Sequence, residues 1–166
     1  KKQVNEKRKV NLSFFFYECL RELAFLCRDF RELQIVGGNM RRREQREHIF
    51  KLLFISEFNT QKEMEEQLAL YLADIENLEE SDRDYISRKY MNIMNHTDEL
   101  DEKLNSISMG WKTSRMNRVD LTVLRLAVYE LEYEKEEVPV GVAINEAVEL
   151  AKCFGSEESG PFVNGI

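Results

Sequence analysis

Apolar residues recur at intervals of three and four along most of the chain, a spacing that predicts helices. A stripe of this kind follows an arginine-rich stretch and predicts a helix over residues 42–57. Thr60 and Glu63 then have the spacing of a capping box, which predicts that a second helix opens there and runs to about residue 75.

Two further helices are predicted before residue 110. Ser81 or Asp82 can cap a helix that continues to about residue 94, and a shorter one covers residues 97–107. Gly110 marks a turn after them. Since no segment alternates with the two-residue period of a strand, we expect an all-α fold.

The C-terminal part of the chain predicts two long helices and the start of another. Asn117 is a suitable N-cap for the first, and Pro139 stands where the first turn of the second tolerates proline. Gly155 is expected to end that second helix. A last helix opens at residues 156–159, and we expect it to be truncated by the end of the sequence at residue 166.

Residues 1–39 form a segment of different character. Their basic start and apolar stretch resemble a signal peptide, but Glu18 and Arg21 interrupt the stretch and no small-residue cleavage site follows. Back-translation of Gly37-Gly38-Asn39-Met40 permits a purine-rich GGAGG-type ribosome-binding site before a start codon. We hypothesise that residues 1–39 are an N-terminal extension that arises from read-through of upstream sequence. Glycine codons without a GGA-GG pattern in the gene would contradict this hypothesis.

The distribution of charge narrows the function classes. The chain has 24 lysines and arginines against 31 acidic residues, a net charge of -7, which argues against a surface that is basic throughout. Four arginines nevertheless gather in residues 41–46, whereas residues 63–80 and 130–137 are strongly acidic. This pattern indicates two different partners. No apolar run approaches the roughly 20 residues of a membrane helix, so we expect no membrane contact. A cytoplasmic protein is expected from the odd count of three cysteines without a C-x-x-C pair.

Residues suited to catalysis or metal binding are scarce. Neither His48 nor His96 has a carboxylate or cysteine at ligand spacing, so no metal site is expected. The chain also lacks glycine-rich phosphate loops and a nucleophile elbow, so no cofactor is expected. These observations favour a binding protein without enzymatic activity.

The arginine cluster is the strongest candidate for a binding site. Arg42, Arg43 and Arg46 lie three and four residues apart at the start of a predicted helix, so their side chains should leave from neighbouring faces. Guanidinium groups bind phosphate oxygens in pairs, and the helix N-terminus adds positive potential. A cationic helix end without a ligand is the alternative, but cations there disfavour the helix itself, which favours a functional role.

Three sequence strings near the C-terminus are more specific than any periodicity. They read R-V-D-L-T-V-L-R-L-A-V-Y-E-L at residues 118–131, A-I-N-E-A-V-E-L-A-K at 143–152 and F-V-N-G at 162–165. Together with the arginine-rich start, they closely resemble the NusB family of bacterial transcription antitermination factors. The resemblance covers about residues 40–166 and leaves residues 1–39 outside.

This resemblance implies an all-α bundle of two small helical subdomains without catalysis. It also implies that the protein binds boxA single-stranded RNA jointly with the ribosomal protein NusE, within the RNA polymerase antitermination complex that serves ribosomal RNA operons. An N-terminal domain of a ribosomal RNA cytosine methyltransferase is the alternative, and a purely structural helical adaptor is a third. The arginines and the F-V-N-G ending favour the antitermination factor.

The resemblance also implies which residues contact the RNA. Arg42, Arg43 and Arg46 match the arginine-rich RNA-contacting motif. Phe162 and Asn164 match the region in which an exposed aromatic ring can stack on an unpaired base. Phe162 has an alternative role as a core anchor of the last helix.

Two acidic positions match the side of the family that faces NusE. They are Asp120 and Glu158, whose charge suits a basic ribosomal protein. Asp120 has an alternative role as a first-turn helix acid. A homodimer that hides the arginines is also left open by the sequence.

Overall fold

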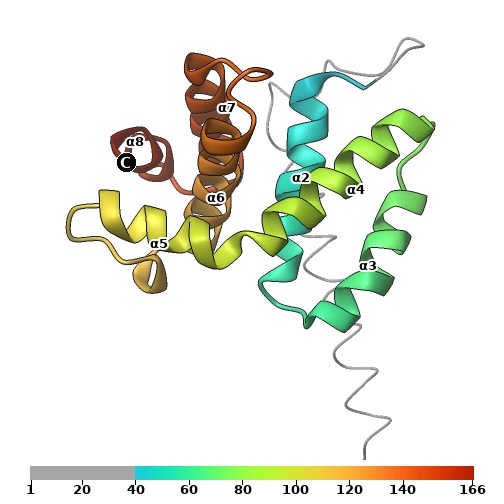
Figure 1. Cartoon of the computed structure of the whole chain (residues 1–166), viewed down its shortest axis with the longest axis horizontal. Helices are drawn as coiled ribbons and strands as arrows, with labels where there is room; N and C mark the ends of the chain where they lie inside the picture. Colours follow the sequence, from blue (N-terminus) through green and yellow to red (C-terminus); the bar gives the residue numbers. More distant parts are fainter. Residues whose placement is uncertain (1–39) are drawn as a thin grey trace, which may run out of the picture.

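The computed structural model describes residues 40–166, so the predicted extension over residues 1–39 lies outside the described residues. Within residues 40–166 all regular structure is helical, which confirms the predicted all-α class (Figure 1). The helices are α2 (Arg42–Ser56), α3 (Gln61–Ala73), α4 (Glu80–Asn95), α5 (Thr97–Ile107), α6 (Arg118–Tyr133), α7 (Val140–Phe154) and α8 (Ser159–Gly165), with a short 3-10 helix η2 (Thr113–Arg115) between α5 and α6.

The helices pack in two groups, as expected for two small subdomains. In the first group α2 packs on α3 and α4, and in the second α6 packs on α5, α7 and α8. Figure 1 shows α3 and α8 at opposite sides of the molecule. Helix α6 also contacts α2 and α4, so one continuous core joins the groups.

Local sequence signals set several helix ends as predicted. The backbone N–H of Thr60 donates to Glu63 Oε2 at 2.8 Å, which completes the capping box at the start of α3. Asn117 Oδ1 accepts from the Val119 N–H at 2.9 Å at the start of α6. Gly110 has a φ of +84°, a left-handed conformation that favours glycine in this turn.

The predicted cap of α4 is wrong. Helix α4 begins at Glu80, with Glu79 as its N-cap, so neither Ser81 nor Asp82 caps it. Asp82 is instead buried, and its carboxylate accepts from the Met40 N–H at 2.8 Å and from Gln45 Nε2 at 2.6 Å. Both partners lie about forty residues earlier in the chain, whereas a helix cap is predicted from neighbouring residues alone.

His48 on α2 makes stability depend on pH. Burial lowers its pKa to about 3, with a smaller contribution from Lys51, while His48 Nδ1 lies 2.8 Å from the Tyr71 hydroxyl. Below its ordinary pKa of about 6.5, histidine in the unfolded chain takes up a proton that the folded protein excludes. We expect this residue to lower the free energy of unfolding by about 2 kcal/mol between pH 7 and pH 5, with the loss levelling off near pH 3. Urea titrations should show a smaller fall for His48→Gln; equal falls would contradict the prediction.

Candidate nucleic-acid interface

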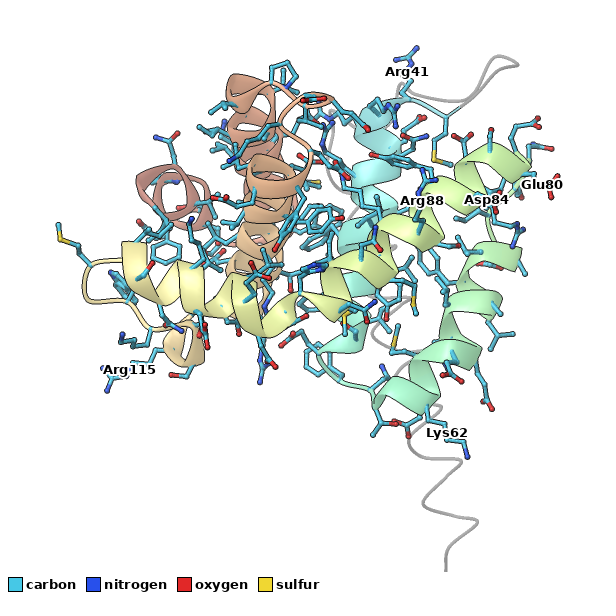
Figure 2. The ribbon with its side chains drawn as sticks, viewed as in Figure 1. Arg41, Lys62, Glu80, Asp84, Arg88 and Arg115 are labelled. Atoms are coloured by element: carbon cyan, nitrogen blue, oxygen red, sulfur yellow. The ribbon has the colours of Figure 1, made fainter. Side chains whose placement is uncertain are left out.

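The start of α2 presents arginines at the surface. Arg41 and Arg42 are exposed, and Figure 2 shows Arg41 at the end of this helix. The Arg42 guanidinium lies 4.6 Å from the centre of the Tyr85 ring, and its Nη1 donates to Gln45 Oε1 at 3.2 Å. Glu44, the acid inside the arginine run, accepts from the Arg41 N–H at 2.9 Å and thereby caps the helix.

Arg46 does not project from the surface with Arg42 and Arg43. The prediction that all three side chains project from neighbouring faces is therefore wrong for Arg46. Its side chain is buried, and Nε donates to Glu130 Oε1 and Oε2 at 2.8 and 3.1 Å. Glu130 lies 84 residues later on α6, and helix periodicity in α2 gives no sign of this partner. Arg46 is therefore held inside the fold.

Glu130 also binds a second buried cation. Lys89 Nζ on α4 donates to Glu130 Oε1 at 2.6 Å and to Glu134 Oε2 at 2.7 Å. Burial alone would lower the pKa of Lys89, but Glu130, Tyr85 and Glu134 together outweigh it, so the net shift of the pKa is upward. The charged groups of Arg46, Lys89 and Glu130 therefore join α2, α4 and α6, and we call them the buried charge cluster.

A chain of contacts leads from the arginines of α2 across α7 to α8. Arg43 Nη2 lies 4.0 Å from Glu149 Oε2, and Glu149 Oε1 accepts from Lys152 Nζ at 2.7 Å. Lys152 is exposed, and its Cγ lies 2.9 Å from where a Cβ on Gly160 would stand. We call Arg43, Glu149, Lys152 and Gly160 the contact path, which places two cations between the start of α2 and the surface of α8.

The turn between α7 and α8 is tight. A Cβ on Gly155 would lie 2.4 Å from Ser159 Oγ, which is the atom that accepts from the Ser156 N–H at 3.0 Å. Beyond this turn, Phe162 is partly buried against the core, in agreement with its alternative role as an anchor, and Asn164 is exposed.

Phe162 has an aromatic neighbour that the sequence analysis missed. The centre of its ring lies 5.4 Å from that of Trp111, with an interplanar angle of 74°. Trp111 is 52% exposed and lies in the connection between α5 and α6. The signal available in the sequence was a tryptophan next to a glycine turn with lysine and arginine nearby.

The two acidic candidates lie in different settings. Asp120 is in the first turn of α6 and is 8% exposed, and its Oδ1 has no hydrogen-bond partner within residues 40–166. Glu158 is exposed at the N-cap of α8. The helices that carry the two residues, α6 and α8, pack against each other.

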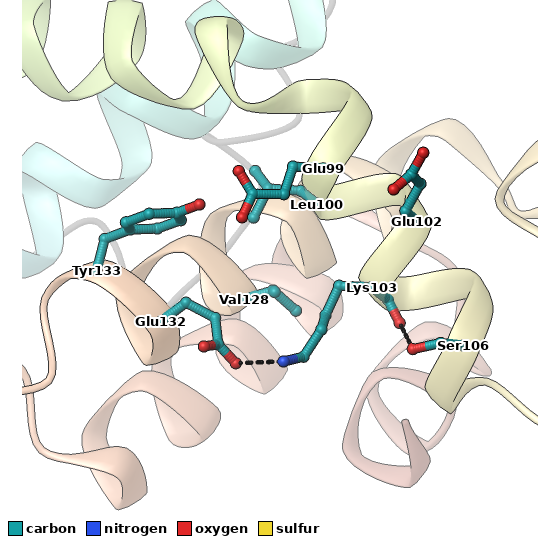
Figure 3. A pocket seen from close by; sticks show the side chains of 8 residues that line it. All are labelled: Glu99, Leu100, Glu102, Lys103, Ser106, Val128, Glu132 and Tyr133. Carbon is teal, nitrogen blue, oxygen red and sulfur yellow. Dashed lines mark hydrogen bonds and ion pairs between the residues drawn. The ribbon is translucent and has the colours of Figure 1, made fainter.

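An acid-lined pocket of about 380 Å³ lies between α5 and α6 (Figure 3). Glu99, Glu102 and Glu132 contribute to its wall, and Lys103 Nζ lies 3.0 Å from Glu132 Oε1. A hydrogen bond with Glu99 raises the pKa of Tyr133 at its rim to about 12. The excess of carboxylates makes this pocket unsuitable for RNA phosphates.

Residues 40–166 contain no group of three or more potential metal-ligating side chains. Nor does this part of the chain contain a helix with the length and apolarity needed to cross a bilayer.

The sequence and the fold both match known proteins. The sequence model that describes the NusB family matches residues 43–166. The chain belongs to the NusB family. It is 47% identical over 127 residues to the transcription antitermination protein NusB of Agathobacter rectalis, an alignment that covers 76% of this chain and 96% of the relative. The corresponding protein of Lachnoclostridium phytofermentans is 45% identical over the same shares.

Solved structures of NusB chains agree with the arrangement of helices. T. maritima NusB matches with a TM-score of 0.70 and 36% identity over 77% of this chain and 88% of that one. A chain from the complex of antitermination factors NusB and NusE with dsRNA matches with a TM-score of 0.62 and 24% identity, over 75% and 90%. The second match shows a shared NusB fold.

Proposed function

We propose that this protein is a transcription antitermination factor that binds boxA RNA jointly with ribosomal protein NusE. The complex then acts with RNA polymerase on ribosomal RNA operons, in the cytoplasm and without catalysis by this chain. Relatives named as antitermination proteins, 47% and 45% identical over nearly their whole length, support this function over the methyltransferase alternative.

The contact path is the observation that carries the RNA-binding part of the proposal. It connects the exposed arginines of α2 with α8 through Arg43 and Lys152. A single strand with phosphates at Arg42 and Arg43 would pass Lys152 before reaching Phe162 and Asn164. Guanidinium and ammonium groups suit its phosphates, and an aromatic ring suits an unpaired base.

Arg46 contributes to this surface indirectly. Because Glu130 holds its guanidinium inside the core, Arg46 fixes the first turns of α2 and so positions Arg42 and Arg43. We propose Arg46 as a positioning residue in place of a direct phosphate contact.

NusE is proposed to contact the acidic residues Asp120 and Glu158. Asp120 lies in the first turn of α6 and keeps a small exposed surface, and its negative charge suits a basic partner. Glu158 adds an exposed negative charge at the start of α8.

Fluorescence anisotropy tests the function directly. A labelled boxA RNA and a scrambled RNA of equal length are titrated with residues 1–166, with and without NusE. We expect selective binding of boxA that NusE strengthens. Equal affinity for both RNAs under both conditions would contradict the proposal and favour the methyltransferase or adaptor alternative.

Salt dependence tests Arg42, which is exposed, and Arg43, which is partly exposed. Each phosphate contact on a single strand contributes about -0.7 to the slope of log affinity against log salt. We therefore expect Arg42→Ala and Arg43→Ala each to make the slope shallower by about 0.7 without lowering the melting temperature. Lys62→Ala is the matched control, because Lys62 is an exposed cation on α3, which Figure 2 shows far from Arg41 at the start of α2. If neither Arg42→Ala nor Arg43→Ala changes the slope of log affinity against log salt, these arginines do not belong to the interface.

A further inference from the structure

Trp111 is an exposed aromatic side chain with an ordered neighbour. It is the single tryptophan of the chain, and half of its surface is open to solvent. Its ring and that of Phe162 meet at 74°, an edge-to-face arrangement. In such a pair the edge of one ring covers one face of the other, and Phe162 is also partly buried against the core, so most of the open aromatic surface belongs to Trp111. An aromatic surface is therefore available for a planar ligand.

The backbone around Trp111 is held in place. Ser108 Oγ donates to the Trp111 carbonyl oxygen at 2.5 Å. This hydrogen bond spans the left-handed turn at Gly110. Further on, the Asn105 side chain donates to Thr113 Oγ1 at 3.1 Å and accepts from the Thr113 N–H at 2.9 Å. Because these bonds fix the connection in the absence of a ligand, binding would order few additional groups.

The charge around Trp111 is opposite to that of the whole protein. Residues 103–119 contain four cations and no acid, in a chain with a net charge of -7. Two of these cations are paired, Lys103 with Glu132 and Arg118 with Glu57.

The other two cations, Lys112 and Arg115, remain available to a ligand. Both are exposed, and neither is ion-paired with a carboxylate in residues 40–166. They follow Trp111 by one and four residues, and Figure 2 shows Arg115 projecting from the molecule. Positive charge beside an open aromatic ring is suited to a polyanion that also carries planar groups.

We propose that Trp111 and Phe162 form a stacking platform for an unpaired RNA base, and that Lys112 and Arg115 neutralise the phosphates next to that base. This inference rests on the proposed RNA-binding function and extends the interface to the connection between α5 and α6. A single strand is the ligand that fits, because its bases expose the ring faces that a duplex keeps stacked. The platform adds a second region of contact to the arginines of α2.

The emission of the single tryptophan reports on the platform directly. We expect boxA RNA to quench Trp111 emission in the presence of NusE, with the same midpoint as the anisotropy titration. Trp111→Ala should weaken RNA binding by about 5- to 150-fold, the range of one base–aromatic stack, and Trp111→Phe should weaken it less. Lys112→Ala should make the salt slope shallower by about 0.7. Met109→Ala is the matched control, because this 95% exposed apolar side chain lies in the same connection.

Other outcomes separate the platform from the proposed function. If RNA binds but leaves Trp111 emission unchanged, and Trp111→Ala binds as tightly as the unaltered protein, the platform is excluded while the function stands. Quenching by NusE alone, with RNA affinity unaffected by the substitution, would assign the ring to a protein interface and also overturn the platform. No RNA binding by the unaltered protein would overturn both. Thermal melting checks whether Trp111→Ala folds. If it does not fold, the RNA affinity of Trp111→Phe and the salt slope of Lys112→Ala test the platform instead.

Discussion

Replacing Glu130 with glutamine is expected to lower the free energy of unfolding by about 3 to 5 kcal/mol. The substitution keeps the shape of the side chain but removes the negative charge shared by Arg46 and Lys89, which are both buried. Glu134 still pairs with Lys89, whereas the structure gives Arg46 no second carboxylate in the part of the chain it describes. An uncompensated guanidinium inside the core is costly because it loses its hydration.

Urea unfolding followed by circular dichroism measures this effect. Glu132→Gln is the matched control, because Glu132 lies two residues further along α6 and pairs with Lys103 at the surface. We expect the control to unfold like the unaltered protein, since exposed ion pairs contribute little. If Glu130→Gln also unfolds like the unaltered protein, the buried charge cluster does not stabilise the fold.

The substitution Gly155→Ala is expected to destabilise the protein by about 3 kcal/mol or more, because it overpacks the turn before α8. The added Cβ would lie 2.4 Å from Ser159 Oγ, 2.5 Å from its Cβ and 2.6 Å from the Ala151 carbonyl oxygen. One of these atoms belongs to the backbone, so the clash cannot be relieved by turning a side chain. We expect α8 to shift away from α7, and Phe162 to move with it.

Two measurements follow this shift. Urea unfolding gives the loss of stability, and Trp111 emission should change in the folded protein because the ring loses its contact with Phe162. Gly141→Ala is the control: no atom lies within 4 Å of its added Cβ, and alanine favours the helix by about 0.5 to 1 kcal/mol over glycine. A Gly155→Ala protein with unaltered stability and emission would show that the turn tolerates a side chain.

Features decided by neighbouring residues were predictable from the sequence. The capping box of Thr60 and Glu63, the cap at Asn117 and the turn at Gly110 depend on residues at most three positions apart, and the structure confirms all of them. Helix spacing likewise predicted the all-α class, whereas the two groups of helices were expected from the family resemblance.

Features decided by distant residues were not predictable in this way. In the sequence Arg46 looks like one of several surface arginines, and only the fold shows its hydrogen bond to Glu130. Asp82 likewise looks like a helix cap, but in the fold it accepts hydrogen bonds from Met40 and Gln45. The sequence identified Phe162 as a candidate but gave no reason to pair it with Trp111, 51 residues earlier. The family resemblance located the candidate interface, whereas tertiary contacts determine which of its side chains are accessible.

The buried charge cluster also bears on how the chain folds during its synthesis on the ribosome. Arg46 is made 84 residues before Glu130, the carboxylate that neutralises it. At about 5 to 20 residues per second, translation separates the two by roughly 4 to 17 s. During this interval α2, α3 and α4 exist without α6, and burying Arg46 and Lys89 would leave two cations without Glu130. The first group of helices therefore completes its packing only after α6 has emerged.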